Sequence, residues 1–345
     1  MIRLEVDRQT PPFGQFLMVG IPGPGVDAVA REMVQDLKVG GIILFSRNLE
    51  TPQQIWHLTH DLQRLAREAG QPPLLISTDQ EGGTVQRLKA PFTPIPAARK
   101  LGATATPKEV EDMSRRVARE LTLVGINMNL APVLDVSLEP RCPLWDRSYS
   151  QEPRRVARFS RAAIKGYLGG GVLPVAKHFP GLGDTLADSH LDLTVAQSGD
   201  PSRKKDLLPY REAVAAGVPA VMTAHLLVPQ WDDLPATLSA VALRGWLRQR
   251  LGFKGVIITD DLEMKGITNL QPPAQAGREA LLAGADLLLI CNNWQAVRDT
   301  VRVLEEAGDP ADQFRESAAR LERLRQALPP QQTGLEEVKE YFGFY

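Results

Sequence analysis

The chain has 345 residues, of which 43% are hydrophobic and 23% are charged. These fractions are close to globular averages and exclude a disordered or collagen-like chain. The 40 Lys and Arg side chains nearly balance the 41 Asp and Glu side chains, which leaves a net charge of -1. Such a balance lacks the net positive charge that is typical of proteins that bind nucleic acid or an anionic membrane, so we expect neither as a partner.

The two cysteines, Cys142 and Cys291, are far apart and belong to no CxxC motif, which disfavours a disulfide scaffold and a thiolate metal site. His57 and His60 have a spacing that suits a metal on a helix face, but no third ligand accompanies them. We therefore expect no metal and no cofactor. The first ten residues carry four charges and no apolar run, and no stretch reaches the length of a spanning helix, so we expect a cytoplasmic protein.

Short apolar runs rich in Val, Ile and Leu recur along the chain. Each run is too short for a helix and is nearly continuous rather than alternating, which is typical of strands buried on both faces of a parallel sheet. The eight runs cover residues 16–20, 41–45, 73–77, 126–136, 172–177, 219–223, 255–259 and 285–290.

Helical signals lie between these runs. Thr106 to Glu109 forms a capping box with a proline at the first helical position. A second helix is expected to begin after Ser150, with Pro153 early in it, and to stop at the glycines at 169–171. Eight strands alternating with helices indicate an α/β fold, a single (β/α)8 barrel, although a doubly wound open sheet would give the same alternation. We expect one catalytic domain over residues 1–345, with a helical tail at 331–345.

Reactive side chains follow several of the apolar runs, where a barrel of this kind builds its active site. Asp79 follows the third run, Lys177 and His178 the fifth, and Asp260 and Asp261 the seventh. The strand geometry predicts that the last two carboxylates point to opposite sides, so that one of them is a candidate nucleophile.

The glycine-rich segment KHFPGLGDTLADSH, residues 177–190, is the most informative part of the sequence. If residues 188–190 are extended, Asp188 and His190 lie side by side. A neighbouring carboxylate raises the pKa of a histidine, which suits a general acid near neutral pH. A turn-capping aspartate followed by a surface histidine is the alternative interpretation of these two residues.

Taken in order, these segments resemble the family 3 glycoside hydrolases, and within them the single-domain bacterial β-N-acetylglucosaminidases of peptidoglycan recycling. The resemblance rests on GGIILFSRN at 40–48, DQEGGTVQR at 79–87, NLAPVLDV at 129–136, DRSYS at 146–150, KHFPGLGDTLADSH at 177–190, VMTAHL at 221–226, LPATLS at 234–239 and LGFKGVIITDDLEMKGI at 251–267.

The resemblance implies a retaining exo-acting β-N-acetylglucosaminidase whose substrate is a carbohydrate, such as a muropeptide that carries N-acetylglucosamine. It assigns the nucleophile to Asp260 and the acid/base dyad to His190 and Asp188. It also assigns sugar binding to five residues, which are Asp79, Arg87, Arg147, Lys177 and His178.

Three positions depart from the family pattern and bear on sugar preference. Leu182 stands where the family often has histidine, Thr84 where it often has arginine, and Trp145 where it often has glycine. Trp145 could stack on a sugar or pack against its own domain. The alternatives to the leading interpretation are a glycosidase of other sugar preference, a glycoside phosphorylase, and a lyase or aldolase that uses Lys177 as a Schiff-base amine.

Overall fold

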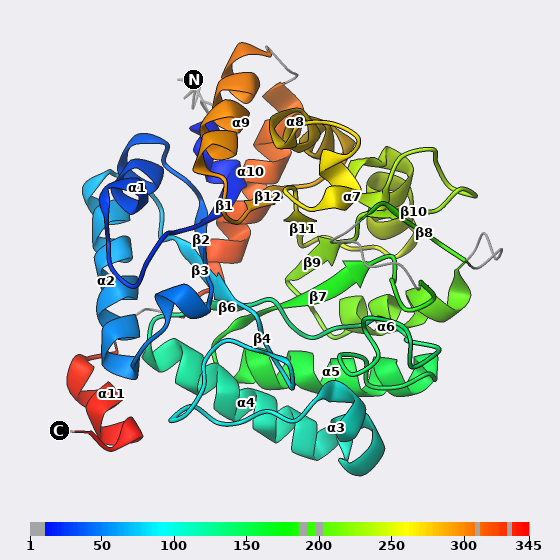
Figure 1. Cartoon of the computed structure of the whole chain (residues 1–345), viewed down its shortest axis with the longest axis horizontal. Coiled ribbons are helices and arrows are strands. Elements are labelled where there is room, and N and C mark those ends of the chain that lie inside the picture. The colour runs from blue at the N-terminus through cyan, green and yellow to red at the C-terminus, as the bar shows by residue number, and fades with distance from the viewer. Residues whose placement is uncertain (1–10, 186–191, 198–202, 308–310, 330–332, 345) are drawn as a thin grey trace, which may run out of the picture.

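The computed structural model describes residues 11–185, 192–197, 203–307, 311–329 and 333–344. Eight parallel strands close into a barrel, and helices surround it (Figure 1). Around the barrel the order is β1, β12, β11, β9, β7, β6, β3 and β2. The strands are β1 (Leu17–Gly20), β2 (Gly41–Leu44), β3 (Leu75–Thr78), β6 (Met128–Asn129), β7 (Leu173–Phe179), β9 (Ala220–Thr223), β11 (Val256–Asp261) and β12 (Leu287–Ile290).

The closed barrel confirms the (β/α)8 prediction and excludes the open sheet. Each of the eight apolar runs supplies one barrel strand, and β1, β2, β3, β7, β9 and β12 are buried along their whole length. Side chains that point inward fill the barrel, while those that point outward pack against the helices, so both faces must be apolar.

The fourth apolar run forms much less strand than its sequence predicts. The run covers residues 126–136, but β6 is limited to Met128–Asn129, and one isolated bridge joins Val133 to Lys177. Pro132 interrupts the run, and proline has no N–H to donate to a neighbouring strand. The rest of the run is therefore a buried irregular segment.

The helices that alternate with the barrel strands bury one face each. The capping box at Thr106 is present, and α4 begins at Pro107 as predicted. The next helix begins at Pro153, shortly after Ser150 as expected, and ends at Gly169, the first of the predicted glycines. The α-helices are α1 (Ala28–Arg31), α2 (Pro52–Glu68), α3 (Ala98–Thr104), α4 (Pro107–Leu123), α5 (Pro153–Gly169), α6 (Lys204–Ala215), α7 (Lys265–Thr268), α8 (Pro273–Ala283), α9 (Trp294–Glu306), α10 (Ala311–Gln326) and α11 (Leu335–Phe342).

Shorter elements decorate the barrel. Two small sheets are formed by β4 (Gln80–Gly82) with β5 (Val85–Gln86) and by β8 (Thr194–Val195) with β10 (Leu226–Leu227). Short 3-10 helices are η1 (Phe13–Phe16), η3 (Ser46–Asn48) and η4 (Ala236–Leu238), and π-helices are η2 (Glu32–Asp36) and η5 (Val241–Arg250).

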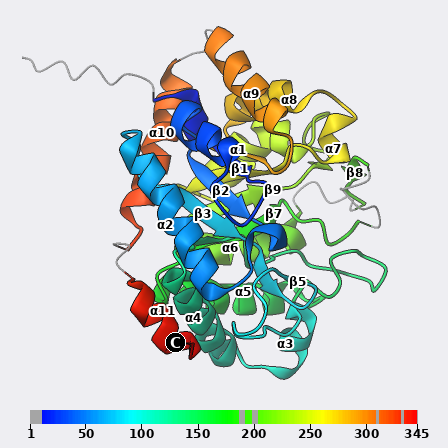
Figure 2. The ribbon, with the colours of Figure 1, turned by 60° about the vertical axis from the view of Figure 1, so that its left-hand side comes forward.

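The last two helices pack on opposite parts of the barrel. Phe314 of α10 contacts Phe13 and Phe16, just before β1, so α10 lies near the amino-terminal ends of the strands. The terminal helix α11 lies beside α2, and Trp56 of α2 donates its indole N–H to the Thr333 carbonyl just before α11 (Figure 2).

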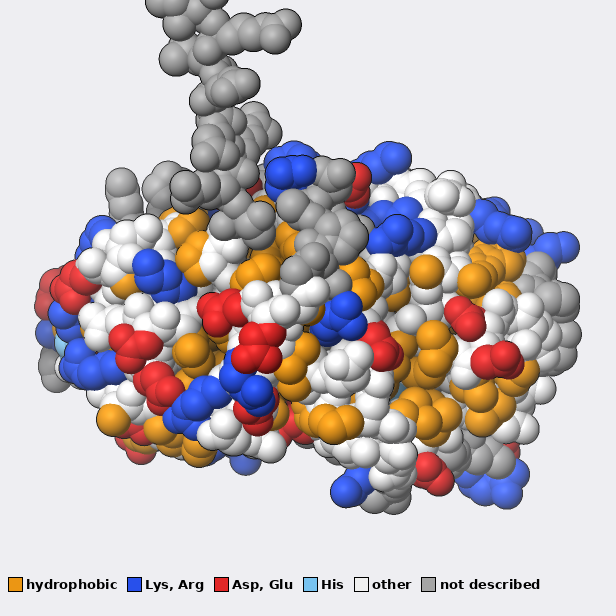
Figure 3. All heavy atoms as spheres, turned by 90° about the horizontal axis from the view of Figure 1, so that it is seen from above, with side chains coloured by type: hydrophobic (Ala, Val, Ile, Leu, Met, Phe, Trp, Pro, Cys, Tyr) orange, Lys and Arg blue, Asp and Glu red, His pale blue; other side chains and the backbone are white. Residues whose placement is uncertain are grey.

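The surface carries charges of both signs. On the face shown in Figure 3, acidic and basic side chains are interspersed with apolar ones, and its described part shows no continuous field of a single sign. Within the described ranges, no helix combines the length and the apolar character needed to cross a bilayer.

Candidate active site

A pocket of about 460 Å³ lies at the carboxyl ends of the barrel strands. Six of the eight residues that the sequence assigned to the site line it, namely Asp79, Arg87, Arg147, Lys177, His178 and Asp260. The other two, Asp188 and His190, lie outside the described residues. Parallel strands end on the same side of a barrel, which is why residues almost 200 positions apart in sequence share one pocket.

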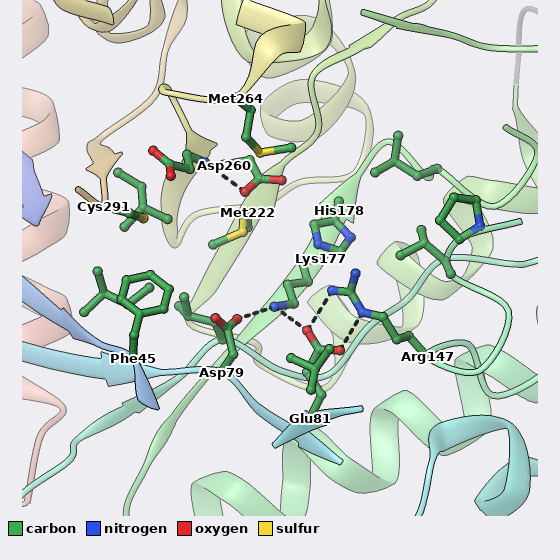
Figure 4. Close-up of a pocket in the computed structure, with 18 of the residues that line it drawn as sticks. Phe45, Asp79, Glu81, Arg147, Lys177, His178, Met222, Asp260, Met264 and Cys291 are labelled. Carbon is green, nitrogen blue, oxygen red and sulfur yellow. Dashed lines mark hydrogen bonds and ion pairs between the residues drawn. The ribbon is translucent and has the colours of Figure 1, made fainter. Parts of the chain in front are cut away.

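A buried ion pair network forms the charged side of this pocket (Figure 4). Lys177 Nζ lies 2.7 Å from Asp79 Oδ1 and 2.6 Å from Glu81 Oε1. Arg147 donates two hydrogen bonds to the same glutamate, one from Nε and one from Nη2, each 2.8 Å long. Arg87 reaches Asp79 at 3.5 Å and is the most loosely held member of the network.

The network fixes the charge of its members. Burial opposes the charge of Glu81, but Lys177 and Arg147 outweigh burial and hold the pKa of that carboxyl well below its usual range. Burial likewise lowers the pKa of Lys177, yet Asp79 and Glu81 reverse the effect and raise it. A Schiff-base amine must be neutral to attack a carbonyl. The ammonium of Lys177 therefore disfavours the lyase alternative.

His178 is held by a carboxylate that the sequence analysis did not single out. Asp135 is completely buried and accepts hydrogen bonds from His178 Nδ1 at 2.8 Å, from the His178 backbone N–H at 3.2 Å and from the Leu182 N–H at 2.7 Å. Because an ionised carboxylate only accepts, the imidazole proton is assigned to Nδ1, which leaves Nε2 available to the pocket.

Asp260 lies opposite this network, beside Met222 and Met264 (Figure 4). Its Oδ1 accepts a hydrogen bond from the Asp261 backbone N–H at 2.8 Å. Burial would raise the pKa of Asp260, but His178, His225, this N–H and Lys177 together lower it below its usual value. The carboxylate is therefore ionised and able to act as a nucleophile.

Asp260 and Asp261 both line the pocket, so neither residue is turned away toward the surrounding helices, as the strand geometry predicted for one of them. Between Ile258 and Asp261, β11 advances three residues while β12 advances two, from Leu287 to Leu289. Such a bulge turns a side chain away from strict alternation. A similar shift on β7, between Ala176 and Phe179, accompanies Lys177 and His178, which also line the pocket as consecutive residues.

Asp261 has a different environment from its neighbour. Its carboxyl accepts a hydrogen bond from the Glu263 N–H at 3.1 Å, and its backbone carbonyl accepts one from His225 Nε2 at 2.9 Å. Burial and the nearby carboxylate of Glu263 raise the pKa of Asp261 to about 7. Of the adjacent pair, Asp260 is therefore the stronger candidate for an anion at neutral pH.

The three departures from the family pattern fall in different places. Leu182 is buried and lines the pocket, whereas Thr84 is exposed and does not. Trp145 does not line the pocket either. The guanidinium of Arg99 stacks on its ring, 3.7 Å from the centroid, and donates a hydrogen bond to its backbone carbonyl. This contact favours the packing interpretation of Trp145 over sugar stacking.

Within the part of the chain that the structure describes, no three His, Cys, Asp or Glu side chains are grouped as ligands for a metal ion. His60 of α2 instead stacks on Trp56, with 3.8 Å between the ring centroids.

Comparison with known proteins identifies the family. Residues 12–324 match the Glycosyl hydrolase family 3 N terminal domain. The chain belongs to glycoside hydrolase family 3. A beta-hexosaminidase from Alkalilimnicola ehrlichii is 36% identical over 310 residues, which cover 87% of this chain and 86% of the relative.

Two solved structures are closely similar to this chain. The β-N-acetylglucosaminidase of Paenibacillus sp. strain FPU-7 has a TM-score of 0.86 and 39% identity, and the match covers 91% of this chain and 61% of that longer one. NagZ from Neisseria gonorrhoeae, solved with N-trifluoroacetyl-D-glucosamine, has a TM-score of 0.82 and 33% identity, and the match covers 94% and 92% of the two chains. These matches confirm the resemblance and the assignment to the glycoside hydrolases.

Proposed function

We propose that this protein is a retaining β-N-acetylhexosaminidase that removes terminal β-linked N-acetylglucosamine. The single observation that carries the proposal is the ionised Asp260 carboxylate, which faces a pocket lined by charged hydrogen-bonding side chains. A relative named beta-hexosaminidase and a solved structure named beta-N-acetylglucosaminidase, at 36% and 39% identity over most of the chain, support the choice of sugar.

The charged network suits the hydroxyl groups of a sugar. Asp79 and Glu81 accept hydrogen bonds, and Lys177, Arg147 and Arg87 donate them, so the network offers both partners that a hydroxyl needs. A volume of about 460 Å³ falls within the range of small-molecule pockets. The lining groups are preorganised by their mutual ion pairs, which reduces the entropy lost when a substrate binds.

The proposed reaction has two displacements. Asp260 attacks the anomeric carbon while protonated His190, oriented by Asp188, gives its proton to the departing oxygen. The glycosyl-enzyme ester then reacts with a water molecule whose proton returns to His190, and the sugar leaves with retained configuration. A histidine base places no second anion beside the nucleophile, and its ordinary pKa near 6.5 suits both steps.

For the physiological substrate we propose peptidoglycan fragments that carry N-acetylglucosamine, with hydrolysis in the cytoplasm. This finer assignment rests on the resemblance of the motifs to the recycling branch of the family. A glycosidase of other sugar preference and a phosphorylase remain as outcomes of the test.

The direct test compares an aryl β-N-acetylglucosaminide with the matching aryl β-glucoside, with and without inorganic phosphate. We expect faster release from the acetamido sugar, with phosphate making no difference. Preference for the glucoside would refute the sugar assignment, and a phosphate-dependent rate that yields a sugar 1-phosphate would refute hydrolysis. Proton NMR of the first product distinguishes retention from inversion.

A further inference from the structure

A second buried cluster lies at the base of the segment that follows β7. Arg203, just before α6, is completely buried and has a positive φ of 42°, in the left-handed region that non-glycine residues seldom adopt. Its Nη2 lies 2.9 Å from Asp206 Oδ2 and 3.5 Å from Asp184 Oδ1, and it donates to the Gly181 carbonyl at 2.9 Å. Arg203 thus connects α6 to residues 181–184.

Burying this arginine is costly. Within the described residues, its Nε and Nη1 are buried without a hydrogen-bond acceptor, so one nitrogen makes all of its polar contacts. A buried cation with unsatisfied donors destabilises a fold unless its contacts compensate. A left-handed backbone adds to the cost. The contacts of Arg203 with Gly181 and Asp184 offset part of this cost.

The segment that Arg203 contacts is fixed from its other side as well. Asp135 accepts a hydrogen bond from the Leu182 N–H, and the Gly183 carbonyl accepts one from the Leu138 N–H at 3.1 Å. Gly183 packs so closely that an added Cβ would lie 2.1 Å from the Val136 carbonyl oxygen. Residues 181–184 are therefore held between Arg203 on one side and the segment after β6 on the other.

We propose that Arg203 is a positioning residue for the hydrolytic reaction, acting through Gly181 and Asp184 on the chain that continues toward Asp188 and His190. The inference rests on the proposed function. Under the proposed function, Asp79, Lys177 and Arg147 hold the sugar from other parts of the barrel. Of residues 181–184 only Leu182 lines the pocket, so the loss of Arg203 slows proton transfer more than it weakens sugar binding. A misplacement of about 1 Å is enough to slow a reaction on the order of 100-fold.

The test is Arg203→Ala, with Arg161→Ala as the matched control. Arg161 of α5 is also an arginine that pairs with a residue of α6, Glu212, but its side chain is 48% exposed and it does not line the pocket. We expect kcat of Arg203→Ala on the aryl β-N-acetylglucosaminide to fall about 10- to 100-fold, with KM and inhibition by free N-acetylglucosamine changing less than about threefold. Arg161→Ala keeps the wild-type values.

Chemical rescue separates positioning from a loss of folding. Arg203→Ala removes a guanidinium group, and guanidinium ion added to the solution should occupy the space that is left. We expect it to raise kcat of this variant saturably, with no gain for wild type or Arg161→Ala. If Arg203→Ala does not fold, Arg203→Lys, which keeps the charge and loses the planar fork, provides the same kcat and KM comparison.

An unchanged kcat in a folded Arg203 variant would overturn the proposal. So would an equal loss of N-acetylglucosamine binding, because that would place the effect in the sugar site. A wild-type protein without activity on the acetamido substrate would refute the proposed function itself, which distinguishes the two failures.

Discussion

Lys177 and Glu81 form an ion pair with 2.6 Å between Nζ and Oε1, and their side chains are only 3% and 6% exposed. Glu81 also accepts both hydrogen bonds of Arg147, so the pair is the centre of the charged network in the pocket. The contacts that we propose for sugar binding also link Lys177 of β7 to the segment that follows β3.

Removing one partner of this pair should destabilise the fold as well as weaken sugar binding. Lys177→Met leaves Glu81 with Arg147 alone and removes the closest cation from Asp79, so we expect a loss of about 3–5 kcal/mol in the free energy of unfolding. Urea unfolding measures it. In the double variant Lys177→Met/Glu81→Gln the loss should be smaller than the sum of the single losses, and strict additivity would contradict the coupling.

Asp135 should act on catalysis through His178. Asp135→Asn keeps the shape, but an amide nitrogen at the position of Oδ2 cannot accept the Nδ1 proton, so the ring loses its assigned tautomer. We expect kcat/KM on the aryl substrate to fall about 10-fold or more. Asp112→Asn, an exposed carboxylate of α4, is the matched control. Wild-type activity in Asp135→Asn would show that the tautomer of His178 does not matter.

The raised pKa of Asp261 predicts a pH dependence of stability. Between about pH 4 and pH 7 this carboxyl is protonated in the folded state and ionised in the unfolded state, so the folded state binds more protons and stability falls as the pH rises through this window. Asp261→Asn removes this contribution. Its stability relative to wild type should therefore increase from pH 4 to pH 8, by about 2 kcal/mol given that neighbouring carboxyls share the protons. Urea titrations at both pH values check this, and parallel pH profiles of the two proteins would contradict it.

Asp260→Asn should abolish turnover while leaving the protein folded. The amide is too weak a nucleophile to form the glycosyl-enzyme, and we expect kcat to fall at least about 1,000-fold, which is on the scale of losing a covalent nucleophile. The thermal midpoint should stay close to that of wild type or fall slightly, because the contacts that lower the pKa of Asp260 stabilise its charge in the folded state. Wild-type-like turnover in Asp260→Asn would refute the assignment.

Most of the fold was predictable because its signal is local. A strand buried on both faces requires an apolar run, and each of the eight runs became a barrel strand. The capping box at Thr106 likewise marked the start of α4. The division into one domain over residues 1–345 stays a prediction.

The residues that sequence analysis missed are those whose role depends on tertiary contacts. Glu81 lies two positions after Asp79, in the middle of the short strand β4. Residues two apart on an extended chain share a side, and this spacing could have predicted that Glu81 joins Asp79 in the site. Asp135 is the one carboxylate inside the apolar run 126–136. An unpaired charge would be costly there, so its position could have predicted a buried partner. The turn of Asp261 toward the pocket depends on a bulge between β11 and β12, which no local pattern of residues indicates.

The most direct test of the central claim is to trap the glycosyl-enzyme. A fluorinated N-acetylglucosamine donor that forms the ester faster than it hydrolyses would be incubated with the full chain, which is then digested and analysed by mass spectrometry. We predict a single labelled peptide with the sugar on Asp260 and no labelling in Asp260→Asn. An ester on another carboxylate, Asp261 included, or turnover without any covalent adduct, would contradict the account.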